Sequence, residues 1–271
     1  MRQYRLIIDR PTIGARNMAI DEAIMNAVVA GAVLPTLRFY AWDPACLSLG
    51  YGQQAADADL DRIATRGWAL VRRATGGRAI LHTDELTYSL TLPEAHPLAA
   101  GGIIESYRRI SRALLAGLSR LGVDLSADRR AAEHKLEGPV CFEVPSHYEV
   151  TTSDGRKLIG SAQLRRRGGV LQHGSLPLVG DLGRIVDALD FPDEAAREAA
   201  RMNVRGRAAT LADAFDGRIF DFDTVADALA HGFATTFDAE LIPGALTPAE
   251  QAEAEQLAAA VYGSAAWTYR K

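Results

Sequence analysis

The sequence predicts an α+β domain with a mixed, mostly antiparallel sheet flanked by helices. Strand-like segments come in runs with helices interspersed, instead of alternating strictly with helices as in a doubly wound parallel fold. Three consecutive strand-like segments between residues 147 and 178 are separated by short turn signals, which is typical of an antiparallel meander. Residues 103–121 and 222–237 instead carry apolar side chains at helical spacing.

The first third of the chain is expected to hold one helix and five short strands. The helix covers Ala15–Ala30, where Met18, Ile24 and Val28 give it an apolar side. Apolar runs or alternating apolar residues predict the strands. They are expected at residues 36–42, 46–51, 68–73, 79–82 and 86–92.

The middle third begins with the clearest helical pattern. Apolar residues recur every three or four positions from Ile103 to Leu121, and Gly122 stands where a helix C-cap belongs. A polar loop at residues 126–139 separates this helix from the meander, whose strands are expected at 147–152, 157–163 and 170–178. An Asp-Gly pair at 154–155 and a Gly-Gly pair at 168–169 predict the turns between them.

The last third is expected to be mainly helical. One apolar stripe runs along residues 222–237. Thr247 and Glu250 form a capping box with Pro248 at the first helical position, so a helix should begin there and end near Val261.

The composition excludes several classes of protein. The 271 residues are 48% hydrophobic and 24% charged, as in a globular protein rather than a disordered or fibrous one. No apolar run approaches the ~20 residues of a membrane span, and the N-terminus lacks signal-peptide features, so a cytoplasmic location without membrane association is expected. The net charge of −4 disfavours nucleic-acid binding. Two cysteines without a nearby histidine pair argue against a metal site.

The first candidate functional segment is 72–82, in which Gly76 and Gly77 lie between two predicted strands. Adjacent glycines let the backbone approach a ligand closely, and the arginines at positions 72, 73 and 78 would suit an anionic group. A tight hairpin turn with solvated arginines explains the same pattern equally well. No Gly-Lys-Ser/Thr follows, so the segment is not a phosphate-binding loop.

The second candidate is Cys141, which Pro139 and Pro145 bracket after a polar loop. A cysteine on a loop of fixed shape suits a nucleophile, although a cytosolic cysteine is more often a small buried hydrophobe. Cys46 lies in an apolar strand and is predicted to be such a core residue.

The third candidate is Lys157, which begins a predicted strand. Only three of the 30 basic residues are lysines, so a lysine within the fold is an unusual choice for this chain. An ammonium group beside a cysteine lowers the pKa of the thiol and raises the thiolate fraction. The alternative is a solvated hairpin lysine. The small residues Gly160, Ser161 and Ala162 that follow leave space for a ligand or for close backbone packing.

Two histidines, His82 and His173, lie in predicted strands. Each one, taken alone, is more simply a hydrogen-bonded core histidine than a catalytic group.

Taken together, these segments resemble the biotin/lipoate A/B protein ligase family over nearly the whole chain. The motifs that carry the resemblance are RRATGGRAILH (72–82) followed by ELTYS (85–89), DGRKLIGSAQ (154–163), QHGSL (172–176) and WTY (267–269). The resemblance implies a fold of the class II aminoacyl-tRNA synthetase and biotin synthetase type. It also implies a single catalytic domain over residues 1–271, with a short helical C-terminal segment at about 248–271 and no accessory domain.

The resemblance also implies roles for individual residues. Cys141 is the implied nucleophile, and Lys157 lowers the pKa of its thiol and helps to position the acyl carbonyl. The residues implied to bind the acyl substrate are Arg73, Gly76, Gly77, Arg78, His82, Gly160, Ser161, Ala162, His173 and Gly174.

Within the family, the Gly-Gly-Arg-Ala and Glu-Leu-Thr-Tyr-Ser runs are similar to the octanoyltransferase branch typical of Gram-positive bacteria. That branch implies transfer of an octanoyl group from octanoyl-acyl carrier protein, through a cysteine thioester, to a lipoyl-domain lysine such as that of glycine cleavage H protein. This would be the first step of endogenous protein lipoylation. No cofactor is implied, because exchange of one thioester for another is nearly isoenergetic and needs no ATP.

Three alternatives stay open. An ATP-dependent lipoate–protein ligase usually shows three glycines where this chain has Gly76, Gly77 and Arg78. An octanoyl-H protein amidotransferase usually lacks the arginine and histidine seen here at positions 78 and 82. A protein that binds carrier protein or lipoyl domains without catalysis is disfavoured by the presence of both Cys141 and Lys157.

Overall fold

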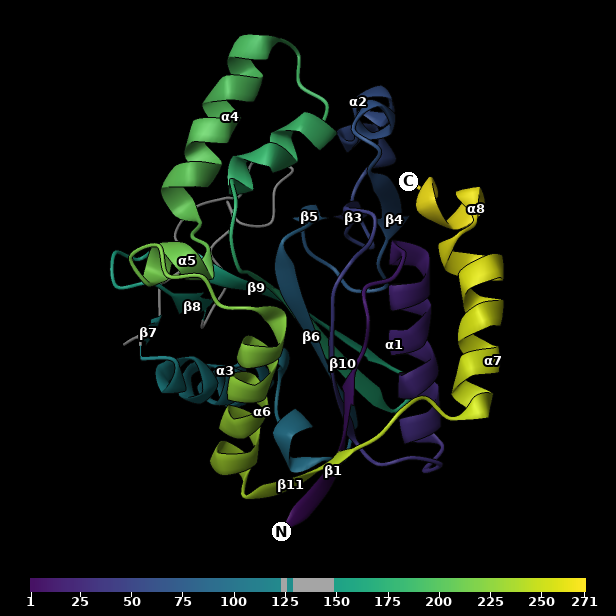
Figure 1. Cartoon of the computed structure of the whole chain (residues 1–271). Coiled ribbons are helices and arrows are strands. Elements are labelled where there is room, and N and C mark those ends of the chain that lie inside the picture. The colour runs from purple at the N-terminus through teal and green to yellow at the C-terminus, as the bar shows by residue number, and fades with distance from the viewer. Residues whose placement is uncertain (123–125, 129–148) are drawn as a thin grey trace.

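An eight-stranded sheet forms the centre of the molecule (Figure 1). The computed structural model describes residues 1–122, 126–128 and 149–271. The strand order is β11-β1-β2-β6-β10-β9-β8-β7. Strand β1 pairs in parallel with β2 and β11, and the other neighbours are antiparallel, so the predicted mixed, mostly antiparallel sheet is confirmed. The strands are β1 Arg2–Ile8, β2 Thr36–Tyr40, β6 Glu85–Pro93, β7 Ser126–Asp128, β8 Glu149–Thr151, β9 Lys157–Arg166, β10 Gly169–Pro177 and β11 Ala239–Pro243.

A second, three-stranded sheet has the order β4-β3-β5, with β4 at Ala69–Arg72, β3 at Cys46–Leu49 and β5 at Ile80–His82. Strands β4 and β5 both pair with β3 and not with each other. The hairpin interpretation of Gly76 and Gly77 is therefore wrong. Their segment instead crosses the end of β3 so closely that a Cβ atom on Gly50 would lie 2.0 Å from the Gly77 carbonyl oxygen.

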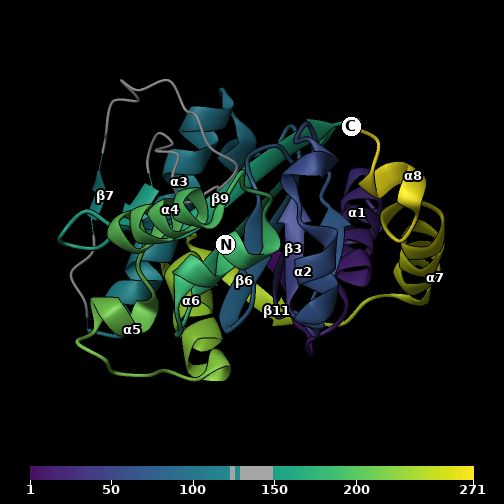
Figure 2. The ribbon, with the colours of Figure 1, turned by 90° about the horizontal axis from the view of Figure 1, so that it is seen from above.

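Two pairs of helices cover the large sheet (Figure 2). Helices α1 (Gly14–Val29) and α7 (Pro248–Leu257) pack together on one face, and α3 (Ile103–Arg120) and α6 (Phe222–Phe237) pack together on the other. The predicted apolar stripe of α3 is buried, including Ile110, Leu114 and Leu118. Helices α3 and α6 cross where a Cβ atom on Gly232 would lie 2.3 Å from the Gly117 nitrogen, so this crossing requires glycine.

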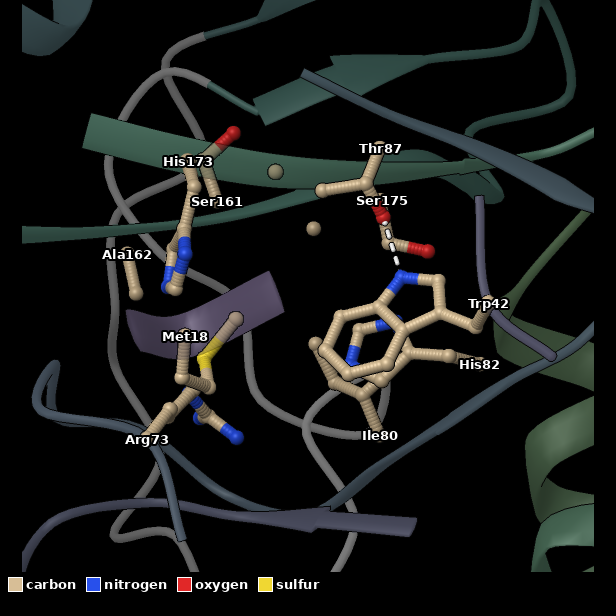
Figure 3. A pocket seen from close by; sticks show the side chains of 12 residues that line it. Met18, Trp42, Arg73, Ile80, His82, Thr87, Ser161, Ala162, His173 and Ser175 are labelled. Carbon is tan, nitrogen blue, oxygen red and sulfur yellow. Dashed lines mark hydrogen bonds between the residues drawn. The ribbon is translucent and has the colours of Figure 1, made fainter. Parts of the chain in front are cut away.

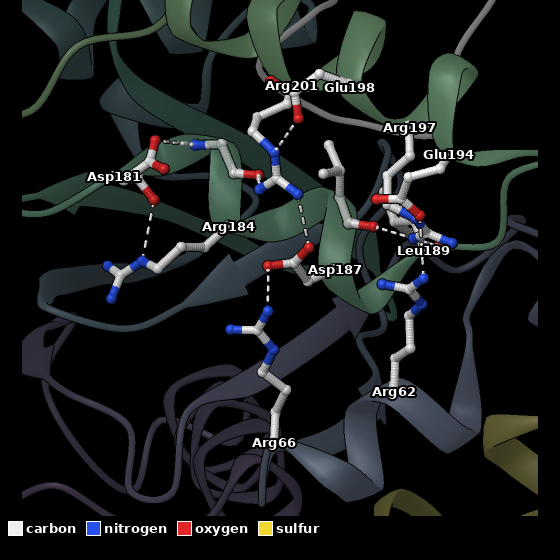
Figure 4. A network of polar contacts seen from close by, with 12 residues as sticks. Arg62, Arg66, Asp181, Arg184, Asp187, Leu189, Glu194, Arg197, Glu198 and Arg201 are labelled. Carbon is white, nitrogen blue, oxygen red and sulfur yellow. Dashed lines mark hydrogen bonds and ion pairs between the residues drawn. The ribbon is translucent and has the colours of Figure 1, made fainter.

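An ion-pair network covers the small sheet (Figure 4). It joins helix α2 (Leu60–Thr65), the 3₁₀ segment η4 (Leu182–Ala188) and helix α4 (Glu194–Arg207). Asp187 on η4 accepts hydrogen bonds from Arg66 at 2.7 Å and from Arg201 at 2.8 Å. Arg197 on α4 donates to the carbonyl oxygens of Val186 and Leu189 at 2.7 and 2.8 Å. These contacts hold η4 and its neighbouring helices over β3 and β5, the two strands that carry part of the site described below.

Most predicted elements are confirmed with end shifts of one to a few residues. The turn between β9 and β10 lies at Arg167 and Gly168, both with positive φ, and Gly169 already belongs to β10. The capped helix α7 ends at Leu257 and continues as a π-helical turn over Ala258–Tyr262. Short helices α5 (Leu211–Ala214) and α8 (Ala265–Thr268) complete the described chain, in which no helix is long and apolar enough to cross a membrane. Strands β1 and β11 and helices α2, α4, α5 and α8 were not predicted as individual elements, and β7 lies within the segment that was expected to be a polar loop.

Candidate functional site

A cavity lies where the small sheet meets α1 and strands β6, β9 and β10 (Figure 3). It encloses about 350 Å³ of empty space, part of it open to solvent. The lining combines apolar side chains with glycines and a few hydrogen-bonding groups, which is the composition expected of a site for an apolar small molecule. The lining residues are Met18, Trp42, Arg73, Ile80, His82, Thr87, Gly160, Ser161, Ala162, His173, Gly174 and Ser175.

Seven of the ten residues predicted to bind substrate come together at this cavity, although they are spread over a hundred residues of sequence. They are Arg73, His82, Gly160, Ser161, Ala162, His173 and Gly174. Gly76, Gly77 and Arg78 are outside the lining, and Arg73 donates hydrogen bonds to the carbonyl oxygens of Gly76 and Arg78. The acyl-binding role of all ten stays a prediction. Met18, Trp42 and Ile80 were not predicted, and no motif marks them.

His82 is held from both sides at the cavity wall. Its Nδ1 lies 2.9 Å from Glu85 Oε1, its Nε2 lies 2.8 Å from Ser48 Oγ, and its ring stacks on Trp42 with the centroids 3.8 Å apart. Since Ser48 Oγ already accepts from Arg73 at 3.1 Å, its own hydrogen can go to Nε2. We assign the tautomer with hydrogen on Nδ1, which donates to Glu85. His82 is thus both a satisfied buried histidine and part of the cavity wall.

Glu85 connects three groups of the cavity wall. Its Oε1 accepts from His82 and from the Thr87 hydroxyl, and its Oε2 accepts from the Ser175 hydroxyl. The Trp42 indole in turn donates to Thr87 Oγ1 at 2.8 Å. Glu85 carried no predicted role, although it begins the ELTYS run. Its partners Thr87 and Ser175 lie in the two motifs that β6 and β10 bring side by side.

His173 links helix α1 to the segment after β4. Its Nε2 lies 2.7 Å from Thr75 Oγ1, and its Nδ1 lies 3.6 Å from Asp21 Oδ2. Burial lowers the pKa of His173, against the opposing effect of Asp21. Burial disfavours the charged form of Asp21 as well, but Arg38 at 2.8 Å and His173 outweigh it and lower the pKa of this carboxyl. His173 is therefore a neutral imidazole that hydrogen-bonds to Thr75 and faces Asp21.

The lowered pKa of His173 predicts a loss of stability on acidification. The unfolded chain takes up the proton near pH 6.5, whereas the folded protein resists it to a lower pH. The contribution of His173 to the free energy of unfolding should therefore be constant above about pH 7 and should fall as the pH falls below about 6.5. Urea titrations at several pH values measure this. His173→Gln should flatten the slope, and an unchanged slope in that variant would contradict the assignment.

Arg73 organises the glycine segment from inside. It is 2% exposed, and its Nη2 donates to the carbonyl oxygens of Gly76 and Arg78, both at 2.8 Å. Its Nη1 donates to the Ser48 carbonyl at 3.0 Å. Gly77 has a φ of +96°, which favours glycine. These hydrogen bonds explain why the arginine and the two glycines occur together.

Arg72 fastens the C-terminal segment to the same region. Its Nε donates to the Thr268 carbonyl at 2.9 Å and its Nη1 to the Gly50 carbonyl at 2.8 Å. The Trp267 indole donates back to the Arg72 carbonyl at 2.8 Å. Arg72 is fully buried, so the interpretation of solvated arginines is wrong for both Arg72 and Arg73. The WTY motif thus packs against the end of β4.

Gly174 is required by packing across β6, β9 and β10. A Cβ atom there would lie 2.5 Å from Ser161 Oγ and 2.6 Å from Tyr88 Cε1, two groups that hydrogen-bond to each other at 2.8 Å. Gly174→Ala should lower the free energy of unfolding by about 1–3 kcal/mol because the extra methyl overpacks this site. It should also slow catalysis, since Ser161 lines the cavity.

The matched control is Gly206→Ala in helix α4. A Cβ atom at this position meets nothing within 4 Å, so alanine should be neutral or raise stability by up to about 1 kcal/mol. Chemical denaturation of both variants makes the comparison. Equal effects of the two substitutions would contradict the packing argument.

The structure describes Lys157 but not Cys141, the two residues predicted to be catalytic. Lys157 is the first residue of β9, three positions before Gly160, and is 6% exposed, so the interpretation of a solvated lysine is wrong. Its carbonyl accepts from the Ala209 amide at 2.9 Å. Lys157 is not in the cavity lining. Cys141 lies outside the described residues.

The other cysteine, Cys46, is confirmed as a core residue. It is fully buried, and burial raises the pKa of its thiol. Among residues 1–122, 126–128 and 149–271, no three side chains of the His, Cys, Asp or Glu type gather as a metal site.

Comparisons with known proteins agree with the fold and the motifs. A family model described as the lipoyl protein ligase A/B catalytic domain matches residues 14–234. "Octanoyltransferase LipM" of Kyrpidia tusciae is 44% identical over the full length of both chains, and the protein of that name from Staphylococcus aureus is 40% identical over 94% of each. The solved structure of a bipartite lipoate protein ligase from Thermoplasma acidophilum superposes with a TM-score of 0.83 at 27% identity, covering 99% of this chain and 97% of that one.

Proposed function

Because the chain belongs to the lipoyl protein ligase A/B catalytic domain family, in its octanoyltransferase branch, we propose that it octanoylates a lipoyl-domain lysine through a cysteine thioester. The enzyme is an acyltransferase of protein lipoylation. The observation that carries this conclusion is full-length identity of 38–44% to several octanoyltransferases. We further propose that residues 1–271 form one catalytic domain and that octanoyl-acyl carrier protein is the donor.

In the first half-reaction, the Cys141 thiolate attacks the thioester carbonyl of the donor. A new carbon–sulfur bond forms to Cys141, the carrier thiolate leaves and takes up a proton, and the octanoyl chain occupies the cavity. Lys157 favours this step by stabilising the Cys141 thiolate. Met18, Trp42, Ile80 and Ala162 suit an alkyl chain because they offer apolar contact.

In the second half-reaction, the neutral amine of the acceptor lysine attacks the new thioester. The carbon–nitrogen bond of the amide forms, the Cys141 thiolate leaves, and the amine proton passes to it or to solvent. Two protein substrates thus use one site in turn, so the kinetics should be ping-pong. The Thermoplasma ligase is described together with "its E2 lipoyl domain", which supports an acceptor of this class.

The test is transfer in the absence of ATP. Purified enzyme, octanoyl-carrier protein and a lipoyl domain are mixed, and the mass of the domain is followed. A gain of one octanoyl group without ATP supports the proposal. Transfer that requires ATP, with AMP released from free lipoate or octanoate, would instead identify a ligase.

A further inference from the structure

A second hollow, which we call the outer groove, lies beside the acyl cavity. It encloses about 1240 Å³ of space, part of it open to solvent, between residues 8–11, residues 83–85, residues 178–179 and residues 219–223. Trp42 lines both the groove and the cavity. The proposed acyl site and a larger space that is partly open to solvent therefore share a wall.

Glu85 holds this wall from the groove side. Glu85 lines the groove and not the cavity, and its side chain is 2% exposed. The three groups that it binds, on His82, Thr87 and Ser175, all line the cavity (Figure 3). Since Thr87 binds the Trp42 indole and His82 stacks on its ring, the carboxylate also fixes Trp42 indirectly.

The wall stands at the end of the sheet where the proposed chemistry occurs. Strand β10 pairs Ser175 with Gly160 of β9 and Pro177 with Glu85 of β6. Lys157 precedes Gly160 by three residues, so Glu85 and Lys157 lie toward the same end of these three strands. A gap in the wall would thus admit water near the carbonyl that Lys157 is proposed to position.

We propose that Glu85 is a positioning residue that keeps this wall closed, so that the octanoyl thioester reacts with the acceptor amine and not with water. This inference rests on the proposed function. Excluding water prevents hydrolysis of a reactive intermediate. A buried carboxylate that accepts from three side chains holds these side chains rigidly in place, and through them it also holds Trp42.

The test compares Glu85→Ala with Glu85→Gln. Alanine leaves His82, Thr87 and Ser175 without their acceptor. The ratio of released octanoate to octanoylated acceptor should rise at least about tenfold, because a single lost buried hydrogen bond already corresponds to that factor. Glutamine should stay near the wild-type ratio. Its oxygen can still accept from His82 and Thr87, and the Ser175 hydroxyl can rotate to accept from its amide.

A second readout does not depend on catalysis. The Trp42 indole N–H should exchange with D₂O about tenfold faster in Glu85→Ala than in wild type. Its NMR signal is assigned as the one that is missing from Trp42→Phe. Asp223→Ala, which changes the groove lining away from Glu85, should alter neither readout. If alanine prevents folding, Glu85→Asp replaces it, because the shorter side chain cannot reach all three donors.

The outcomes separate the inference from the proposed function. A folded Glu85→Ala variant with the wild-type partition ratio and the wild-type indole exchange would overturn the role of Glu85. If the wild-type enzyme forms no octanoyl thioester, the proposed function fails, and indole exchange alone still decides whether Glu85 closes the wall. If the indole hydrogen exchanged as fast in Glu85→Gln as in Glu85→Ala, the hydrogen bonds of residue 85 would not be what closes the wall.

Discussion

Replacing Cys141 with alanine is expected to abolish the octanoyl-enzyme and to reduce octanoyl transfer by several orders of magnitude. Alanine removes the sulfur that accepts the acyl group, and no other group in the proposed mechanism can replace it. Wild-type enzyme incubated with octanoyl-carrier protein should gain the mass of one octanoyl group, and Cys141→Ala should gain none. Intact-protein mass spectrometry makes the measurement.

The matched control is Cys46→Ala, which removes the other cysteine of the chain. Cys46 is fully buried in the core and burial raises the pKa of its thiol, so it should hold little thiolate at neutral pH. The Cys46→Ala variant should therefore still form the octanoyl-enzyme. If Cys141→Ala still gained an octanoyl group and Cys46→Ala did not, the nucleophile would be Cys46 and not Cys141.

The elements predicted from the sequence are those with a strong local signal. Helix α3 has an apolar residue on every turn, and α7 begins with a capping box that the structure reproduces. Helix α4 was missed because its apolar side is narrow: only Arg197 and Val204 are buried along its 14 residues. Its contacts with η4 are both apolar and polar, since Val204 packs into the apolar cluster that η4 joins, while Arg197 and Arg201 donate hydrogen bonds to η4.

The site was predictable only where residues fall in motifs. Motif residues such as His82, Ser161 and His173 do meet at the cavity. Asp21 and Trp42 were missed because their partners are far away in the sequence: Asp21 meets Ser89 and Trp42 meets Thr87, across pairings that no local pattern encodes.

The arginines of the 72–82 segment show a different limit of sequence analysis. Their positive charge suggested binding of an anion, yet Arg72 and Arg73 donate to backbone carbonyls of neighbouring segments. A guanidinium has five donors and can satisfy several buried carbonyl oxygens at once, which a lysine cannot do in the same geometry. The pattern of arginines and glycines therefore marked the segment as important, but it could not distinguish a structural role from a role in ligand binding.

Replacing Asp21 with alanine is expected to have the largest effect on stability. Asp21 is 1% exposed and accepts from Arg38 at 2.8 Å, from Tyr40 at 2.9 Å and from Ser89 at 2.9 Å, besides facing His173. Its removal leaves a buried guanidinium short of countercharge, which typically costs about 3–5 kcal/mol. The effect should be near the lower limit, since Arg38 keeps Asp9 at 2.7 Å. Urea denaturation measures the change in the free energy of unfolding.

A double-mutant cycle with Arg38→Met tests the reason for this loss. If the cost of Asp21→Ala comes mainly from the uncompensated charge of Arg38, then removing both partners should destabilise the protein less than the two single effects added together. Additive effects would mean that the lost hydrogen bonds of Tyr40 and Ser89 dominate instead. Octanoyl transfer by Asp21→Ala should fall even at temperatures where the variant is fully folded, because His173 loses the group that orients it at the cavity wall.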